Sequence, residues 1–379
     1  MIDILFLVIF LEIIGIICEY NPFHNGHLYH IKKIKELYPN SLIILVLNGY
    51  FLERGEISII TKETKTSIAL QYGVDIVLEL PFIFGTQSAD TFASISLKML
   101  NNFHVNRIIF GSESNNINLI TELAKKQLNK KYDKKVKEYL NEGINYPTAL
   151  AKALNVDFDF APNDLLAISY VKEIIKNKYP IIPESIQRTN DYHDKKSNDF
   201  IISASNIREK IKNKIPINKY LPVEAINNIV DIDSNKLWLL LKYKINTSND
   251  LRVYLDVDEG IENRLKKKVK ECNSYEEYIN SIKTKRYTTN KINRMLIHIM
   301  IGLKKNDNIK NLDYIKILGM SKKGKKYLNT IKDNLVIPTI INKKSIIYKY
   351  ELLASIIYDI ICNTKTYNYE LKNKPVIID

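Results

Sequence analysis

The stretch "EYNPFHNGHLYH", residues 19–30, decides the fold class of this 379-residue chain. It follows the apolar run "IIGII" (13–17), which has the length and composition of a buried strand. It leads into a segment whose apolar residues recur every three positions, which predicts a helix over residues 27–38. A strand that turns directly into a helix is typical of the first unit of a parallel α/β sheet.

The same alternation continues through the first half of the chain. We expect strands at 42–47, 74–80 and 105–110 and helices at 61–72, 88–101, 123–140 and 161–176. Asn163 or Asp164 can cap the last of these helices, and "FIISASNIREKIKN" (200–213) reads as a strand that feeds a Ser-capped helix. This rhythm predicts βαβ units and a mostly parallel sheet with helices on both faces. Beyond about residue 240 helical patterns dominate, among them 262–271 and 348–361.

The net charge of +14 is concentrated in the second half of the chain. Residues 1–200 hold 22 Lys and Arg against 23 Asp and Glu, a balance of −1, whereas residues 201–379 hold 34 against 19, a balance of +15. A neutral half beside a basic half suggests that one part performs chemistry while the other binds a polyanion, nucleic acid first of all. Tyrosines interleave with the basic runs and can stack unpaired bases. A lysine-rich solvated surface is the alternative explanation.

The cysteines and the first residues bear on the compartment. Cys18, Cys272 and Cys362 lie far apart without metal-ligand spacing, so neither a disulfide framework nor a zinc knuckle is indicated, and a reducing cytosol fits best. The apolar run 1–18 is interrupted by Asp3 and Glu12 and lacks a basic leading region. We therefore expect a cytoplasmic protein without a membrane anchor.

The histidines of residues 19–30 stand where a parallel sheet binds its ligands, beyond the carboxyl end of a strand. A helix N-terminus there offers unpaired N–H groups and about half a positive charge, which suits phosphate. Gly26 has no side chain to hold a nucleotide away. His24 and His27 can both face that opening and donate to an α-phosphate as its charge grows. A zinc site from His24, His27 and His30, or histidines with only a structural role, are the alternatives.

Several stretches in order resemble the bacterial tRNA(Met) cytidine acetate ligase family (TmcAL). They are "GIICEYNPFHNGH", "NGYFLERGE", "GVDIVLELPF", "IIFGSE", "APNDLLAISY", "ESIQRTNDYHD" and "ISASNIRE", followed more weakly by "TKRYTTNKINRMLIH" (284–298) and "LGMSKKGKKYL" (318–328). The likeness is clearest from Glu12 to Lys210. Ordered blocks of this kind are much more specific than one motif. Residues 1–10 fall outside the resemblance and are expected to be a dispensable extension.

The resemblance implies a HIGH-type nucleotidyltransferase fold, related to class I aminoacyl-tRNA synthetases. The fold class expected is α/β, with a Rossmann-like parallel-sheet (HUP-type) catalytic domain at 11–240 and a basic, mostly helical tRNA-binding domain at 241–379. The implied activity is ATP-dependent and independent of acetyl-CoA. Acetate is activated as acetyl-AMP with release of pyrophosphate, and the acetyl group passes to N4 of cytidine 34 in the anticodon loop of elongator tRNA(Met). Mg²⁺ is expected because ATP chemistry usually needs it.

The resemblance also implies roles for individual residues, with His24 and His27 as catalytic groups on the phosphates. The ATP site would comprise Ile17, Cys18, Glu19, Tyr20, Asn21, Pro22, Phe23, His24, Asn25, Gly26, His27, Leu28, Tyr29, His30, Gly111, Asn163 and Arg188. A second phosphate signature would use Ser203 and Ser205 as helix caps, with Arg208 in the first turn. Arg54 is either catalytic or an ion-paired loop residue. "GMSKKGKK" (319–326) resembles a synthetase KMSKS loop only in part, and we expect a basic RNA-contact or solvated segment there.

Two other functions stay open at this point. A small-substrate adenylyltransferase of the same fold would use His24 and His27 but would leave the basic half without a role. A non-catalytic RNA-binding protein with a vestigial nucleotide site would use the basic half but not the histidines. A His24→Ala variant distinguishes an enzyme from a non-catalytic RNA-binding protein. The RNA-binding protein should keep its function, whereas an enzyme should lose its catalytic rate.

Overall fold

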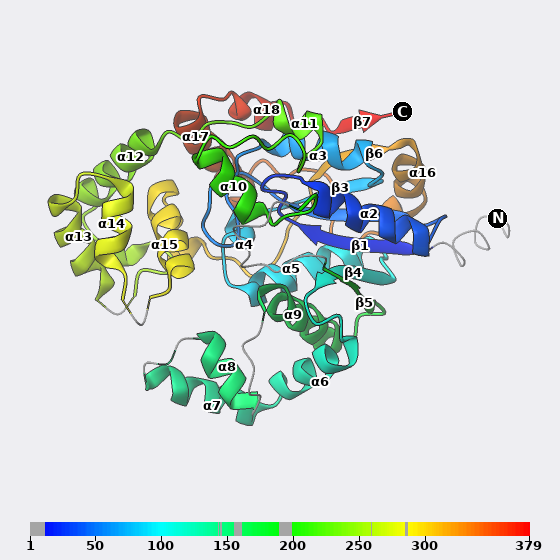
Figure 1. Ribbon diagram of the computed structural model, residues 1–379, viewed down its shortest axis with the longest axis horizontal. Coiled ribbons are helices and arrows are strands. Elements are labelled where there is room, and N and C mark those ends of the chain that lie inside the picture. Colours follow the sequence, from blue (N-terminus) through cyan, green and yellow to red (C-terminus); the bar gives the residue numbers. More distant parts are fainter. Residues whose placement is uncertain are drawn as a thin grey trace.

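The strands form one twisted sheet at the centre of the molecule (Figure 1). The computed structural model describes residues 12–142, 144, 146–154, 161–188, 199–258, 260–284 and 287–379, so the extension expected at 1–10 lies outside it. Within these residues the sheet has seven strands in the order β5-β4-β1-β2-β3-β6-β7. In that order the strands are Ile182–Gln187, Arg107–Ser112, Ile13–Cys18, Leu42–Asn48, Ile76–Leu80, Ile317–Ser321 and Val376–Ile378.

The first five strands in that order run parallel, which confirms the α/β fold expected from the sequence. Among the strand pairs of the described residues, only β3–β6 is antiparallel. The strands β1 and β2 are apolar along almost their whole length because helices cover both faces of a parallel sheet. At Gly15 in β1 a Cβ atom would lie 2.7 Å from a methyl carbon of Leu100, so a larger residue there would force this side chain of the helix behind it to shift.

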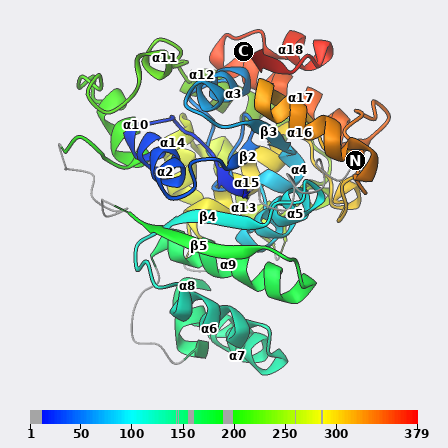
Figure 2. The ribbon, with the colours of Figure 1, turned by 90° about the vertical axis from the view of Figure 1, so that its right-hand side faces the viewer.

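Two layers of helices sandwich the sheet. The helices α2 (Asn25–Leu37), α3 (Lys62–Gln71) and α10 (Ala204–Lys212) pack on the face that carries Ile14 and Ile16. The helices α5 (Ala89–Asn102) and α9 (Pro162–Asn177) pack on the opposite face, which carries Ile13. In Figure 2, α6 (Ile117–Gln127), α7 (Lys130–Asn141) and α8 (Tyr146–Leu154) lie beyond α9, away from the sheet.

Two local expectations were wrong. The segment 200–202 is not a strand, and the edge strand β5 is formed instead by residues 182–187, where only Ile186 is buried. An edge strand with so few buried positions carries little hydrophobic signal. The lysine-rich stretch 123–140 is not one helix either. The helical conformation is interrupted at Leu128 and Asn129, and the Asn129 side chain caps the next helix, α7.

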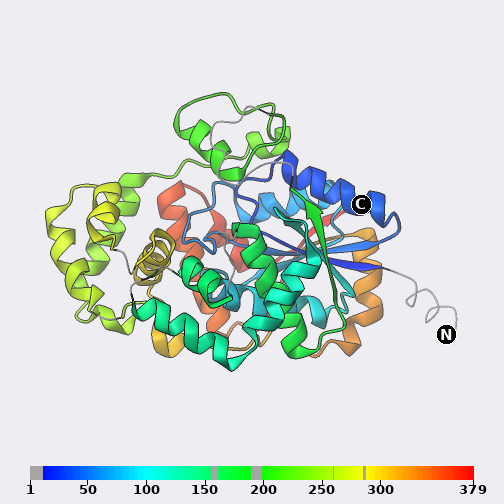
Figure 3. The same ribbon diagram turned by 60° about the horizontal axis from the view of Figure 1, so that its bottom comes forward.

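The second half of the chain builds a helical lobe and then returns to the sheet. The lobe contains α12 (Ser234–Thr247), α13 (Ile261–Glu271), α14 (Tyr275–Ile282) and α15 (Thr289–Ile301), and Figure 3 shows it projecting from one side of the sheet. The chain then forms β6, α16 (Lys322–Ile331), α17 (Ile346–Cys362), α18 (Thr366–Lys372) and β7. A boundary at residue 240 therefore leaves two strands of the sheet outside the region 11–240, which the fading strand pattern did not reveal.

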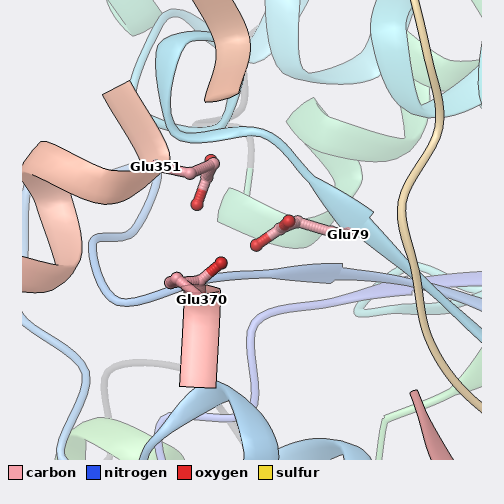
Figure 4. Close-up of side chains that lie close together, drawn as sticks. All are labelled: Glu79, Glu351 and Glu370. Carbon is pink, nitrogen blue, oxygen red and sulfur yellow. The ribbon is translucent and has the colours of Figure 1, made fainter. Parts of the chain in front are cut away.

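The returning segment is tied to the first half by a buried cluster of charges (Figure 4). Lys62 of α3 contacts Glu79 of β3, and its Nζ lies 3.1 Å from Glu351 of α17 and 2.6 Å from Glu370 of α18. Lys316 adds a second ammonium 2.5 Å from Glu370. The three carboxylates are close enough together to hold a metal ion, but Lys62 already supplies their positive charge.

The carboxyls of this cluster differ in charge. Burial, reinforced by Glu79, raises the pKa of Glu351 to about 8, so this carboxyl keeps its proton at neutral pH. Burial opposes ionisation of Glu370 as well, but Lys62 and Lys316 together lower its pKa to about 2. The cluster is thus close to electrically neutral, as a fully buried group of charges must be.

The stretch "GMSKKGKK" forms the end of β6 and the start of α16, near the amino-terminal ends of the parallel strands. Lys323 Nζ donates to the carbonyls of Asn40 and Ser41 just before β2, at 3.1 and 2.6 Å. At Gly324 a Cβ would lie 2.0 Å from the carbonyl oxygen of Asp75, just before β3. Parallel sheets bind nucleotides at the carboxyl-terminal ends of their strands, so this stretch is not a KMSKS-type loop. None of the helices in the described part of the chain is long and apolar enough to cross a bilayer.

Candidate nucleotide-binding site

The turn between β1 and α2 is held by two histidine side chains. His24 is the N-cap of α2, and its Nδ1 accepts a hydrogen bond from the amide of Gly26 at 2.9 Å. The amide of His24 in turn donates to Nδ1 of His27 at 3.2 Å. A nitrogen that accepts cannot carry the proton, so both rings are protonated at Nε2. Each ring therefore offers one N–H donor away from the backbone turn.

These imidazoles are neutral. Burial, together with the positive charges of Arg188 and Arg208, lowers the pKa of His24 to about 3. Burial also lowers the pKa of His27 well below its usual value, with His24, His30 and Arg188 adding to the effect. The two rings lie with centroids 3.9 Å apart and a tilt of 32°, an arrangement that would be unfavourable for two cations. The pair can thus donate hydrogen bonds to an anion without bringing a fixed charge.

A pocket of about 260 Å³ opens over this turn, beyond the carboxyl ends of β1, β4 and β5. Most of the site residues named from the sequence line it: Ile17, Cys18, Glu19, Tyr20, Asn21, His24, Gly26, His27, Tyr29, His30, Gly111, Asn163, Arg188, Ser203, Ser205 and Arg208. Pro22, Phe23, Asn25 and Leu28 are not among the lining residues. Phe23 is fully buried in the core, and the Asn25 amide donates to the carbonyls of Phe200 and Lys219 instead.

The predicted caps differ from those in the structure. Ser203 caps α10, since its Oγ accepts from the amide of Asn206 at 3.2 Å, but Ser205 does not cap and accepts instead from Arg208 Nη2 at 3.3 Å. The N-cap of α9 is Ala161, with Pro162 following it, so neither Asn163 nor Asp164 has that role. Their side chains serve the turn after β4: Asp164 accepts from Ser112 Oγ at 2.5 Å, and Asn163 donates to Glu113 at 2.5 Å.

Two arginines bring positive charge to the pocket. Burial lowers the pKa of Arg188, although Glu113, 3.7 Å from its Nε, favours the charged form. In the described residues no hydrogen-bond acceptor reaches this buried Nε, so an anion in the pocket would satisfy it. Arg208 lies in the second turn of α10 rather than the first. It donates to the carbonyl of Asn21 at 2.7 Å and pairs with Glu56 at 2.9 Å.

Sequence reasoning missed one wall of the pocket, the loop between β2 and α3. Glu53, Arg54 and Glu56 of this loop line the pocket, of which only Arg54 was considered. Glu19 positions the loop, because its Oε1 accepts from the amide of Glu53 at 2.7 Å and from Asn48 Nδ2 at 3.0 Å. The available signal was the stretch "NGYFLERGE", which resembles the family without showing which side chain faces the site.

The three neighbouring histidines do not form a zinc site. The Nδ1 atoms of His24 and His27 are already occupied by backbone amides. In the part of the chain that the structure describes, the one group with metal-binding spacing is Glu79, Glu351 and Glu370, which includes none of these histidines and already contacts Lys62.

The fold and the pocket define a nucleotide-binding α/β protein of the HIGH nucleotidyl transferase class, and the model of that family matches residues 11–374. The chain is 38% identical to the tRNA(Met) cytidine acetate ligase of Geobacillus sp. (strain WCH70), over 92% of this chain and 94% of that protein. It is 35% identical to the ligase of Bacillus subtilis (strain 168), over 87% of each. The chain belongs to the tRNA(Met) cytidine acetate ligase family, as its sequence predicted.

Solved structures of this family share the fold. Thermotoga maritima TmcAL bound with alpha-thio ATP superposes with a TM-score of 0.83 at 26% identity, over 97% of this chain and 99% of that one. The apo form of the same protein gives a TM-score of 0.85 at 25% identity. The seven-stranded arrangement described here is therefore the family fold.

The buried histidines make stability depend on pH. Below its usual value of 6.5 the His24 ring gains a proton in the unfolded chain, while in the folded chain it stays neutral until about pH 3. Between pH 6.5 and about 3 the unfolded state binds more protons than the folded state. The contribution of the neutral His24 to stability is therefore complete above pH 6.5 and is lost as the pH falls. We expect His24→Asn, which keeps the cap, to flatten this fall by up to about 1.4 kcal/mol per pH unit. Urea unfolding at several pH values between 4 and 7 checks this, and parallel curves would contradict it.

Gly55 sets the position of the loop between β2 and α3 against the helical lobe. Its φ is +69°, and a Cβ there would lie 2.3 Å from the amide nitrogen of Arg294 in α15. We expect Gly55→Ala to destabilise the protein by about 2–4 kcal/mol, from backbone strain and the clash together. Gly260→Ala is the control, because Gly260 has φ +82° but, its chain neighbours aside, no atom of the described residues within 4 Å of a Cβ. Equal losses in thermal unfolding would show that the close approach to α15 contributes nothing.

Proposed function

We propose that this protein is an ATP-dependent ligase that transfers acetate to N4 of cytidine 34 in elongator tRNA(Met). The observation that carries the proposal is the match along nearly the whole chain to proteins named tRNA(Met) cytidine acetate ligase. The pocket supports it, because it has the neutral donors and the cations that a triphosphate needs, and a relative of the same fold binds an ATP analogue. No observation favours a small-substrate adenylyltransferase or a non-catalytic RNA binder.

The chemistry divides into two steps. A carboxylate oxygen of acetate attacks the α-phosphorus of ATP, and pyrophosphate leaves with the electrons of the broken P–O bond. We assign the Nε2–H groups of His24 and His27 to the phosphate oxygens, where negative charge grows during this step. Arg188 and Arg208 supply countercharge, and the N-terminus of α2 supplies backbone N–H groups. In the second step the cytidine amine takes the acetyl group from acetyl-AMP.

The tRNA is assigned to the basic second half. Its balance of +15 and the lobe α12–α15 beside the pocket side of the sheet suit the phosphates of an anticodon arm (Figure 1). A cytidine in a loop can leave its stack more easily than one in a duplex and so can reach an adenylate in a pocket.

Mg²⁺ remains a prediction from the need to shield a triphosphate. The described residues of the pocket do not form a ready Mg²⁺ site, since Glu19 holds the loop and Glu56 is paired with Arg208.

The test is incubation of the purified protein with ATP, radiolabelled acetate and an elongator tRNA(Met) transcript. We expect labelled tRNA with acetate and none with labelled acetyl-CoA, and nucleoside mass spectrometry should place N4-acetylcytidine at position 34. No product with any such transcript would refute the proposal. Pyrophosphate exchange that depends on a phosphorylated small molecule rather than on acetate would instead indicate an adenylyltransferase.

A further inference from the structure

The loop between β2 and α3 joins the pocket to the helical lobe. Arg294 of α15 donates from Nη1 to both the carbonyl oxygen and Oε1 of Glu53, each at 3.2 Å. Gly55 packs directly against the backbone of Asn293 and Arg294. Two stretches that the sequence singled out without giving them a role, 48–56 and 284–298, therefore meet at this contact. A side chain of the proposed RNA-binding half thus holds a carboxylate at the wall of the nucleotide pocket.

Glu53 differs from the other carboxylates of the pocket. Glu19 accepts two hydrogen bonds that fix the loop, and Glu56 is paired with Arg208 at 2.9 Å. Glu53 is 80% buried, and its Oε1 is held by Arg294. Within the described residues no hydrogen bond is made to its Oε2. Of the carboxylates that line the pocket within the described residues, Glu53 is the one that a side chain of the helical lobe holds.

We propose that Glu53 is the general base of the acetyl-transfer step, a role that rests on the proposed function. The lone pair of the cytidine N4 amine attacks the carbonyl carbon of acetyl-AMP, and a C–N bond forms. The C–O bond to the phosphate then breaks, and AMP leaves as an anion with that electron pair. The amine must lose one proton to end as a neutral amide, and the Glu53 carboxylate accepts it. A neutral carboxyl results, which a pocket wall buries more easily than a carboxylate.

The electrostatics of the loop agree with this role. Burial raises the pKa of Glu53 to about 7, and Glu19 and Glu56 act in the same direction. Arg294 and Arg54 oppose the rise and favour the ionised form. A base whose pKa lies near the working pH combines a useful ionised fraction with a useful proton affinity. The activation step needs no such base, because acetate is already an anion.

Arg294 is by the same argument a positioning residue. It touches the base rather than the reacting atoms, and it stands on the lobe assigned to tRNA. Arg294→Lys keeps the charge but is shorter than the side chain whose Nη1 reaches Glu53, so transfer should fall with Arg294→Lys and fall further with Arg294→Met.

The test separates the two half-reactions with Glu53→Gln, which keeps the size of the side chain. Acetate-dependent exchange of pyrophosphate into ATP should stay within about threefold of the wild type. Single-turnover transfer from enzyme-bound acetyl-AMP to tRNA(Met) should fall by about 100-fold or more at pH 7. The wild-type transfer rate should rise with pH and level off above about pH 7, and the residual rate of the variant should lack that dependence. Glu36→Gln, which removes an exposed carboxylate of α2, is the control.

The outcomes distinguish this inference from the proposed function. Retained exchange also shows that the variant is folded. If Glu53→Gln transfers acetyl at the wild-type rate, or is folded and yet loses exchange and transfer together, Glu53 is not the base. If Glu53→Gln does not fold, Glu53→Asp decides, since a shortened carboxylate should restore part of the transfer rate and a structural role would not give that recovery. If the wild type shows no acetate-dependent exchange, the proposed function itself is wrong.

Discussion

Replacing His27 by Asn is expected to slow acetyl-AMP formation by about 100- to 1,000-fold while leaving the fold nearly unchanged. The Asn Oδ1 stands close to where the histidine Nδ1 accepts from the amide of His24, so the capping box survives. What is lost is the Nε2–H that we assign to the phosphate. Acetate-dependent pyrophosphate exchange measures the effect, and thermal unfolding checks the fold.

His27→Gln is the matched control. Its amide nitrogen reaches the position of Nε2 but offers nothing at the position of Nδ1, so it keeps the donor and loses the cap. We expect this variant to be less stable than His27→Asn and yet more active. The reverse order of activities would mean that the histidine acts by shaping the turn and not by donating to the nucleotide.

Replacing Lys62 by Met is expected to cost about 3–5 kcal/mol of folding stability. Lys62 is fully buried and contacts Glu79, Glu351 and Glu370, so its removal leaves carboxylates without their main countercharge. Urea unfolding at pH 7 measures the loss. Removing a carboxylate as well, in Lys62→Met with Glu79→Gln, should recover part of it. A loss below about 1 kcal/mol would show that the cluster relaxes or admits water.

The same cluster offers a sharper comparison between two glutamates. Glu351 keeps its proton at neutral pH, so Glu351→Gln replaces a neutral group by a neutral group and loses only one of the two acceptors that Lys62 and the amide of Phe82 use, at a cost of about 1–2 kcal/mol. Glu370 is ionised and lies between Lys62 and Lys316, so Glu370→Gln should cost about 3 kcal/mol. Equal costs in urea unfolding would mean that the proton resides elsewhere in the cluster.

The sequence predicted those parts of the fold that repeat a local pattern. The strands β1 to β4 and the helices α2, α3 and α5 between them follow from apolar runs and three-residue periodicity, with ends shifted by one or two residues. The strand β5 was missed because five of its six residues are not buried. The strands β6 and β7 were missed because they are short and because β6, on which β7 pairs, joins the sheet beside β3, more than 200 residues earlier in the chain. No local pattern records such a pairing.

For the site, the sequence located the turn between β1 and α2 and most of the residues that line the nucleotide pocket, but it missed the wall formed by the loop between β2 and α3. His24, Gly26 and His27 are adjacent in sequence, so their convergence follows from a single strand-to-helix turn. Glu53 and Arg294 are 241 residues apart, and only the packing of α15 on the loop brings them together. The detailed hydrogen bonding was also beyond reach, since Ser205 and Asn163 found partners other than the helix ends they could have capped.

The late return of the chain to the sheet has a consequence for synthesis on the ribosome. Until residues 317–321 leave the exit tunnel, β3 has no outer neighbour and presents unpaired backbone groups along its edge. Until α17 and α18 follow, Lys62 lacks two of its three carboxylate partners. A nascent chain that stalls or terminates before this point therefore has an unpaired strand edge and a Lys62 ammonium without most of its countercharge. We expect such a chain to require a chaperone or to be degraded.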